Sequence, residues 1–225
     1  MRRAILIFFV VISMILLLSG CAAKSYLFDF TVEPDLARND GIWTTASANF
    51  ELTPSKGLIL KGIWAAAPHY YDGDFNVEHV FELKENDTYH RGLYLVISSD
   101  VHTGDAEWYG GLRIMDEPYT SGDFHITYIQ GQYSIATLIP ITTSVPVSQI
   151  LVYPGENTVN LQKTGNLLSI KLNGVKLGTG LEISGYNLDW FCPVIATYYE
   201  TMAPWDLVIY KSMEVLFKGR QVLTY

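Results

Sequence analysis

Short runs in which apolar and polar residues alternate, separated by Gly, Pro, Asn and Asp, recur along most of the 225-residue chain. In the run Phe75–Leu83, every second position carries an apolar residue or His79. A period of two residues is typical of a strand with one buried face, whereas the apolar positions of an amphipathic helix repeat about every 3.6 residues. No stretch shows a convincing helical stripe. The pattern therefore predicts an all-β fold, an antiparallel β-sandwich or barrel.

The segment 158–177 is the most sharply defined. Its apolar residues alternate on one face before and after a polar turn. The dipeptide Asn173-Gly174 is typical of a two-residue hairpin loop, because a type I′ turn needs positive φ at both central residues. In that register Leu172 faces Val175, so the apolar faces of the two strands coincide. We expect three antiparallel strands here.

Further strands are expected at residues 26–30, 75–84, 92–97, 108–115, 124–129, 134–139, 149–153 and 206–217. No linker, repeat of solenoid length or low-complexity segment interrupts the chain after residue 26, which predicts a single domain. Hydrophobic residues make up 49% of the chain, enough for a substantial core, and this composition argues against disorder.

The first 20 residues differ in kind from the rest. Two arginines precede an apolar run from Ala4 to Leu18. This run is short for a transmembrane helix, which needs about 20 residues, but it fits the charged and apolar regions of a secretory signal. We therefore expect a signal peptide at residues 1–20, a short tether at 21–25 and the β-sandwich domain at 26–225.

The charge balance excludes one class of partner. The chain has 15 Lys and Arg against 23 Asp and Glu, and its formal net charge is −8. Without the first 20 residues, which hold two Arg and no acid, the net charge is −10. Nucleic-acid phosphates are bound by clustered Lys and Arg, and the sequence holds no such cluster. We therefore expect no nucleic-acid partner.

Leu18-Ser19-Gly20-Cys21 resembles a bacterial lipobox. The resemblance implies cleavage before Cys21 and a diacylglyceryl group on its thiol. It implies a lipid-anchored protein of the bacterial cell envelope, and Ala22 favours the outer membrane if the host is diderm. An uncleaved anchor, or an ordinary signal with an incidental cysteine, is the alternative. Strand-like alternation begins five positions after Cys21, so the tether would hold the domain within about 20 Å of the headgroups.

Three stretches together resemble the concanavalin A-like lectin/glucanase family, which includes laminin-G-type modules. They are Asp72-Gly73-Asp74-Phe75, Arg91–Ile97 and Asn157–Leu177, and they cover less than a third of the domain. The resemblance implies a jelly-roll β-sandwich whose two curved sheets bind sugars on the concave face or at the rim, sometimes beside calcium. Because this fold hosts many unrelated functions, it does not by itself predict one.

Aromatic residues are the clearest excess, at 13% of the chain. Many of them lie beside Gly, Pro or acidic residues and hence near expected loops. Trp and Tyr rings stack on the apolar faces of sugars, although sandwich cores and membrane surfaces also use large aromatics. The candidate ligand-binding residues are Tyr70, Tyr71, Trp108, Tyr109 and Tyr199.

The acidic residues predict no catalytic pair. Glu78 and Glu82 share a strand face but lie about 13 Å apart along it, beyond the carboxylate separations of glycosidases. Asp105 and Glu107 have a shorter spacing but lie beside an expected loop, where acids are usually solvated. We therefore assign no catalytic residue from the sequence.

Asp72 and Asp74 are the candidate metal ligands. They flank Gly73 in an expected turn, and two carboxylates with nearby carbonyl oxygens could begin a calcium site. Asp-Gly-Asp is also ordinary turn chemistry. The five His residues never pair at ligand spacing, and His79 is expected to be a hydrogen-bonded core residue. With Cys21 lipidated, Cys192 has no disulfide partner and is expected to be buried.

Three functions remain open from the sequence. The first is a membrane-anchored, non-catalytic module that binds carbohydrate or another surface ligand. The second is a glycoside hydrolase or lyase of the concanavalin A-like fold, which needs two carboxyl groups within about 10 Å in a cleft. The third is a structural envelope lipoprotein that binds protein partners through an exposed sheet face.

Overall fold

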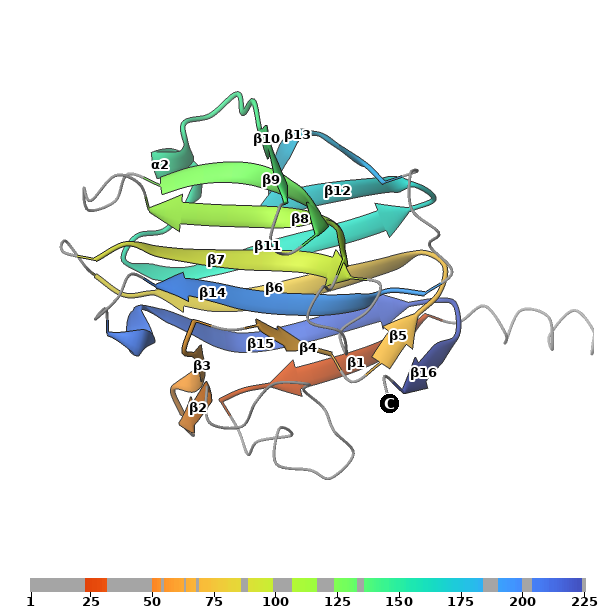
Figure 1. The fold of residues 1–225 in the computed structure, drawn as a ribbon, viewed down its shortest axis with the longest axis horizontal. Coiled ribbons are helices and arrows are strands. Elements are labelled where there is room, and N and C mark those ends of the chain that lie inside the picture. Colours follow the sequence, from red (N-terminus) through yellow and green to blue (C-terminus); the bar gives the residue numbers. More distant parts are fainter. Residues whose placement is uncertain are drawn as a thin grey trace, which may run out of the picture.

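The computed structural model describes residues 23–31, 50–53, 55–62, 64–67, 69–85, 89–98, 107–116, 124–132, 136–183, 190–199 and 204–223. Within these ranges the chain forms two antiparallel sheets that overlie each other, and a small third sheet near one end (Figure 1). The predicted all-β sandwich is confirmed. The described ranges hold no helix that is both long and apolar enough to span a membrane.

Sheet A contains eight strands among the described residues. Seven of them lie in the spatial order β13 (Val175–Glu182), β12 (Leu167–Leu172), β11 (Gly155–Thr164), β6 (Phe75–Leu83), β15 (Val208–Phe217), β3 (Gly57–Leu60) and β2 (Phe50–Thr53). The eighth, β1 (Lys24–Asp29), also pairs with β15. The first described strand is therefore held by a strand near the C-terminal end of the chain.

Sheet B is the second layer. Its described strands lie in the order β10 (Thr137–Pro140), β9 (Phe124–Gln132), β8 (Glu107–Asp116), β7 (Arg91–Ser98), β14 (Cys192–Tyr199) and β4 (Trp64–Ala66). Strands β5 (His69–Tyr71) and β16 (Gln221–Leu223) form sheet C. The described helical elements are single turns, α2 (Val147–Ile150) and η3 (Trp205–Leu207).

Strand β6 shows how alternation builds the sandwich. Its odd-numbered residues from Phe75 to Leu83 are buried, and the even-numbered residues between them are partly exposed. The buried side chains face those of sheet B, and the two sets form the main core. Strand β7, in contrast, is apolar on both faces and lies between β8 and β14, as its sequence predicts for a central strand.

The predicted hairpin at Asn173-Gly174 is confirmed. Both residues have positive φ, 49° and 81°, which is the backbone that a type I′ turn requires. Leu172 lies opposite Val175, as predicted. Because Gly and Asn tolerate positive φ better than other residues, this dipeptide sets the register of β12 and β13.

The strand predicted at 149–153 is wrong. The chain instead forms the helical turn α2 followed by bends, and Leu151 N–H donates to Val147 O at 2.8 Å. Prolines at 146 and 154 bracket this stretch, and a proline has no N–H to donate to a sheet. The buried Ile150 and Leu151 pack on the main core from this turn, which explains the apolar character of the segment.

His79 is buried, as predicted, but the predicted hydrogen bond is absent. Its side chain is 0% exposed, and neither ring nitrogen has a hydrogen-bond partner among the described residues. Removal from water disfavours the charged imidazolium, so burial lowers the pKa of His79 to about 3. The ring is therefore a neutral member of the core at neutral pH.

Candidate functional site

The outward surface of sheet B carries a row of side chains from five neighbouring strands. Trp64 of β4 is paired with Ala196 of β14, which is paired with Tyr94 of β7. Tyr94 is paired in turn with Arg113 of β8, and Arg113 with Thr127 of β9. Directly paired residues lie on one face, and neighbouring strands are about 4.8 Å apart. We call these five residues the aromatic row.

The alternation within the strands directs this row away from the main core. Leu93 and Leu95, the neighbours of Tyr94 in β7, belong to the main core between the sheets. Trp64 and Tyr94 instead pack against a second buried cluster. That cluster consists of Ala66, Val96, Ile129, Cys192 and Val194. The predicted burial of Cys192 is therefore confirmed, and its side chain lies on the same face of sheet B, four positions along β14 from Ala196.

Small residues separate the large side chains on this face. Ala196 lies between Trp64 and Tyr94, which places the two aromatic residues about 10 Å apart across the strands. In the next row, Gly92 lies between Met115 and the half-exposed Tyr198. The small residues are themselves buried: Ala196 is 2% exposed, and a Cβ on Gly92 would lie 2.7 Å from the Met115 side chain.

The polar groups on this face suit a hydroxyl-rich ligand. Arg113 supplies a guanidinium beside Tyr94, and a guanidinium offers several N–H donors in one plane. The Thr127 hydroxyl is buried and has no hydrogen-bond partner within the described part of the chain. A buried polar atom of this kind is normally satisfied by water or a ligand.

Carboxylates are missing from the same surface. Among the outward-facing side chains that are described in β4, β7, β8, β9 and β14, none belongs to Asp or Glu. Asp116 at the end of β8 is buried, and its carboxylate lies 3.9 Å from Arg91 Nε. Glycoside hydrolysis by the usual routes needs a carboxylate pair. The described side chains here provide contacts for binding rather than an acid–base pair.

Of the five aromatic residues predicted to bind ligand, Tyr70 lies at this surface. It is partly buried and packs on the same cluster as Trp64 and Tyr94. Tyr71 and Tyr109 are members of the main core, at 0% and 4% exposed, so their rings face the interior. Burial raises the pKa of the Tyr71 hydroxyl. The backbones of Trp108 and Tyr199 lie in β8 and β14, and their side chains are outside the described part.

Sequence reasoning missed Trp64, Tyr94 and Tyr198. For Tyr198 and Tyr94, the alternation of residues along the strand could have indicated an outward-facing position. In β14, Tyr198 is in phase with Val194 and Ala196 and out of phase with the core residue Ile195. Tyr94 is likewise out of phase with its leucine neighbours. An aromatic residue at the outward phase of a two-sided apolar strand was thus the pattern to follow.

Asp72 and Asp74 both contact protein donors. Asp72 accepts hydrogen bonds from the main-chain N–H of Arg220 and, at 2.8 Å, from its Nε. Partial burial acts to raise the pKa of Asp72, but the bonds from Arg220 outweigh it, and the pKa is lowered. Asp74 accepts from Gly165 N–H at 2.8 Å and lies 3.9 Å from Lys163 Nζ. The two acids thus tie the start of β6 to different strand ends.

No group of three or more His, Cys, Asp and Glu side chains within the described residues could hold a metal ion. A calcium ion prefers about six to eight oxygen ligands. Asp72 and Asp74 would supply two of these ligands, and both already accept hydrogen bonds from protein donors. Calcium binding at Asp72 and Asp74 therefore stays a prediction. Cys21 precedes the described residues, so lipid attachment also stays a prediction.

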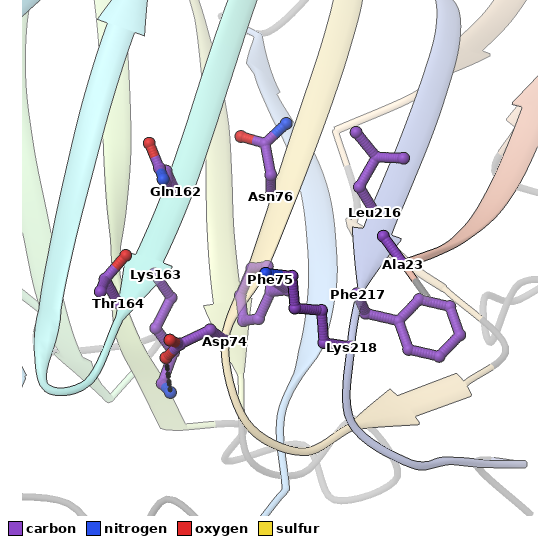
Figure 2. Close-up of a pocket in the computed structure, with 10 residues that line it drawn as sticks. All are labelled: Ala23, Asp74, Phe75, Asn76, Gln162, Lys163, Thr164, Leu216, Phe217 and Lys218. Atoms are coloured by element: carbon purple, nitrogen blue, oxygen red, sulfur yellow. Dashed lines mark ion pairs between the residues drawn. The ribbon is translucent and has the colours of Figure 1, made fainter. Parts of the chain in front are cut away.

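A separate pocket of about 340 Å³ lies on the outward side of sheet A (Figure 2). Strands β6, β11 and β15 supply most of its lining, and Ala23 contributes from the chain just before β1. Asn76, Gln162 and Leu216 form one cross-strand row over it. This pocket and the aromatic row lie on opposite outer surfaces of the sandwich.

Sheet A also holds an acid pair that the sequence could not show. Glu78 of β6 lies directly opposite Glu214 of β15, on the outward face. Directly opposed residues have Cβ atoms about 5 Å apart. Ser25 Oγ donates a hydrogen bond to the Glu214 carboxylate at 2.5 Å. The two carboxylates come from strands far apart in the sequence, so a single-strand search does not find them.

The sequence matches no protein-family model, and no curated protein sequence matches it. Solved structures nevertheless share its fold. The CBM2 module of the Lactobacillus casei BL23 phage J-1 evolved Dit has a TM-score of 0.58 and 11% identity, over 87% of this chain and 96% of that one.

Two further structures extend the likeness. The carbohydrate recognition domain of Emp46p, in its metal-free form, has a TM-score of 0.52 and 11% identity over 86% of this chain and 95% of that one. The apo Crh5 transglycosylase has a TM-score of 0.50 and 13% identity, over 88% of this chain and 86% of that one. At these identities the likeness establishes the fold, a lectin- and glycosidase-like β-sandwich, and leaves function to the site.

Proposed function

We propose that this protein binds a glycan at the outward surface of sheet B without cleaving it. The observation that carries the proposal is the aromatic row, in which Trp64 and Tyr94 are held about 10 Å apart by the intervening Ala196. Aromatic rings contact the C–H faces of sugars, and Arg113 and Thr127 are placed to bond hydroxyl groups. The carbohydrate recognition domain of Emp46p has the same fold, which is consistent with this use.

A glycan array probed with the full-length protein in mild detergent tests the proposal. We expect Trp64→Ala and Tyr94→Ala each to weaken binding of a hit glycan by about 30-fold, since truncating a central aromatic anchor costs about 2 kcal/mol. Leu216→Ala, on the opposite outer surface, is the matched control and should bind like the wild type. Binding that survives both aromatic truncations would refute this location.

The glycan-binding assay is repeated with a chelator and with added calcium. Because Asp72 and Asp74 already accept bonds from Arg220 and Gly165, we expect glycan binding to persist in a chelator. Binding that is lost with chelator, restored by calcium and abolished by Asp72→Asn would instead identify the two acids as calcium ligands.

The proposal places the glycan-binding domain at a bacterial membrane through a lipid on Cys21, in the outer membrane if the host is diderm. The lipobox-like sequence before Cys21 supports this part of the proposal. Metabolic labelling with an alkyne-bearing fatty acid in a bacterial host tests it. We expect label on the wild type and none on Cys21→Ser, and equal labelling of the two would contradict the assignment.

A second candidate is glycoside hydrolysis at Glu78 and Glu214. The observation that favours it is their direct opposition across β6 and β15, close to the separation that retaining glycosidases use. Incubating each hit glycan with the wild type and with Glu78→Gln separates the two functions. Cleavage that Glu78→Gln abolishes would make this protein an enzyme, and intact glycan in both samples favours binding alone.

A further inference from the structure

The pocket on sheet A lies where the chain arrives from its N-terminal segment. Ala23, two residues after Cys21, lines the pocket. Two extended residues span at most about 7 Å. Any lipid on Cys21 would therefore place the mouth of this pocket at the level of the membrane headgroups, which is not true of the aromatic row on the other sheet.

Exposed leucines gather around the same pocket. Six large apolar side chains are exposed among the described residues, and three of them, Leu27, Leu167 and Leu216, belong to this region. Leu216 lines the pocket, and Leu167 lies opposite Thr164, another lining residue. Ser25 is paired with Leu216, and Leu27 is two positions after Ser25. Leu27 therefore projects from the same face of sheet A as Leu216. Apolar side chains clustered beside an anchor point suit the membrane interface.

The charges at the pocket are mostly positive, although the chain as a whole is acidic. Lys163 and Lys218 line it, and Asp74 is the acid among its lining residues. Lys163 is buried, and its Nζ donates to Gly73 O at 2.9 Å and lies 3.9 Å from Asp74.

We propose that this corner of sheet A docks on the anchoring membrane and takes the phosphate-bearing headgroup of an anionic lipid into the pocket. Lys218 would pair with a headgroup phosphate, since basic residues near an anionic membrane surface are attracted to it. The amides of Asn76 and Gln162 point to the outward side and can bond the phosphate and glycerol oxygens (Figure 2). The three leucines enter the interface around it.

The proposal rests on the lipid anchor proposed above and adds an orientation to it. With the outward side of sheet A on the membrane, the outward side of sheet B faces away from it. The aromatic row is then presented to glycans in the surrounding space. A domain hanging freely from its tether would have no such preferred orientation.

The test uses the full-length protein purified from membranes and placed in lipid nanodiscs of phosphatidylcholine, with or without phosphatidylglycerol. The readout is the acetylation rate of individual lysines, followed by mass spectrometry. We expect Lys218 to react about fivefold more slowly when phosphatidylglycerol is present, which corresponds to about 1 kcal/mol of protection. Lys56, an exposed lysine in the turn before β3 whose carbonyl accepts a hydrogen bond from Lys211 at the other end of β15 from the pocket, is the control and should react equally in both nanodiscs.

Other outcomes overturn the proposal in distinguishable ways. Protein that fails to remain with nanodiscs refutes the anchor and the docking together. Protein that stays with both nanodiscs but shows equal Lys218 reactivity refutes the docking alone. Protection of Lys218 by inorganic phosphate in detergent, to the same extent as by lipid, would indicate a soluble anion site. Loss of the protection in Leu27→Ser, with Lys56 unchanged, would support the membrane contact.

Discussion

The two outer surfaces of the sandwich are built from different kinds of side chains. The outward positions of sheet A carry charged residues in its middle, including Glu78, Glu82, Glu156, Lys171 and Glu214. The described outward positions of sheet B carry Trp64, Tyr94, Tyr198 and a buried apolar cluster, with Arg113 as their charged residue. One surface suits water and headgroups, and the other suits a ligand that covers aromatic rings.

The difference between the two sheets shows that the alternation of core-facing apolar residues does not by itself predict a polar outer face. Both sheets place apolar residues toward the shared core at every second position. In sheet A the intervening positions are mostly polar, as expected for a sheet with one face in solvent, with Leu27, Leu167 and Leu216 as exposed exceptions. In sheet B the intervening positions of β7 and β14 are apolar or aromatic as well. The second apolar side of sheet B is itself buried, since Ala66, Val96 and Val194 are at most 1% exposed.

The largest effect is expected at Gly111, which is paired with Val96 of β7 and Ile129 of β9 in the row next to the aromatic row. A Cβ added there would lie 2.6 Å from Val96 Cα and closer still to Leu95 O, both main-chain atoms of β7. Because backbone cannot move aside cheaply, Gly111→Ala should reduce the free energy of unfolding by about 3 kcal/mol or more. Urea unfolding followed by tryptophan fluorescence measures it.

Gly165→Ala, in the turn between β11 and β12 of sheet A, is the control for that substitution. Nothing lies within 4 Å of the added Cβ there, and the cost is that of a positive φ of 56°. A loss of about 1 to 2 kcal/mol is expected from the backbone alone. If both variants lose the same free energy of unfolding, the close contact between β7 and β8 is not the cause of the loss at Gly111.

Local patterns predicted most of this fold because the information they carry is local. The alternation in Phe75–Leu83 and the dipeptide Asn173-Gly174 each specify structure within a few residues, and both predictions are confirmed. The stretch 149–153 failed for the same reason. Its apolar residues are consistent with a short buried strand or a buried turn, and packing on the core decides between them.

The candidate site could be predicted only in part, because it is assembled by long-range register. Trp64 and Tyr94 become near neighbours through Ala196, which is more than a hundred residues later in the chain than either. No local pattern encodes that pairing. Tyr70, predicted from its aromatic cluster, packs at the sheet B surface, and its role in binding stays a prediction. Tyr71 beside it belongs to the core, since adjacent residues of a strand face opposite sides.

The next largest effect is a dependence of stability on pH, caused by His79 on the interior side of sheet A. His79 is neutral in the fold, with its pKa lowered by burial to about 3, whereas an unfolded histidine titrates near about 6.5. Between these values the unfolded chain binds a proton that the folded chain does not. Stability should therefore fall with decreasing pH below about 6.5, by up to about 1.4 kcal/mol per pH unit.

His79→Leu should remove this dependence. Relative to the wild type, the variant should gain about 2 kcal/mol between pH 7.5 and pH 5, as the pKa difference dictates. Unfolding in urea at the two pH values measures the gain, and His125→Leu, at an exposed position of sheet B, is the control. Parallel pH curves for His79→Leu and the wild type would mean that the buried ring is protonated or hydrogen-bonded.

A smaller effect is expected at Arg113, the charged residue of the sheet B surface. Arg113→Gln keeps hydrogen-bond donors and removes the charge. Binding of a glycan that carries carboxylates should weaken by about tenfold, because a hydrogen bond to a charged group contributes about 1.5 kcal/mol to binding. Binding of neutral glycans should change much less. Titration of matched acidic and neutral oligosaccharides separates the two cases, and equal losses would assign Arg113 a packing role.

The smallest effect is expected at Glu82, on the outward side of sheet A. Hydrogen bonds from Lys211 at 2.8 Å and Lys84 at 2.5 Å lower the pKa of Glu82. A carboxyl group with a lowered pKa stabilises the fold above its unfolded pKa, and the contribution disappears as the pH falls through the folded value. Because the ion pairs are near the surface, Glu82→Gln should cost less than about 1 kcal/mol at pH 7 and nothing in acid.

Unfolding of Glu82→Gln and the wild type across this pH range measures the difference between them. Glycan affinity, measured on the same two proteins, should be identical, because Glu82 and the aromatic row lie on opposite outer surfaces. A change in glycan affinity in Glu82→Gln would show that the two surfaces are coupled through the core. The sandwich would then transmit the charge state of sheet A to the proposed glycan site on sheet B, and the division of roles proposed for the two sheets would fail.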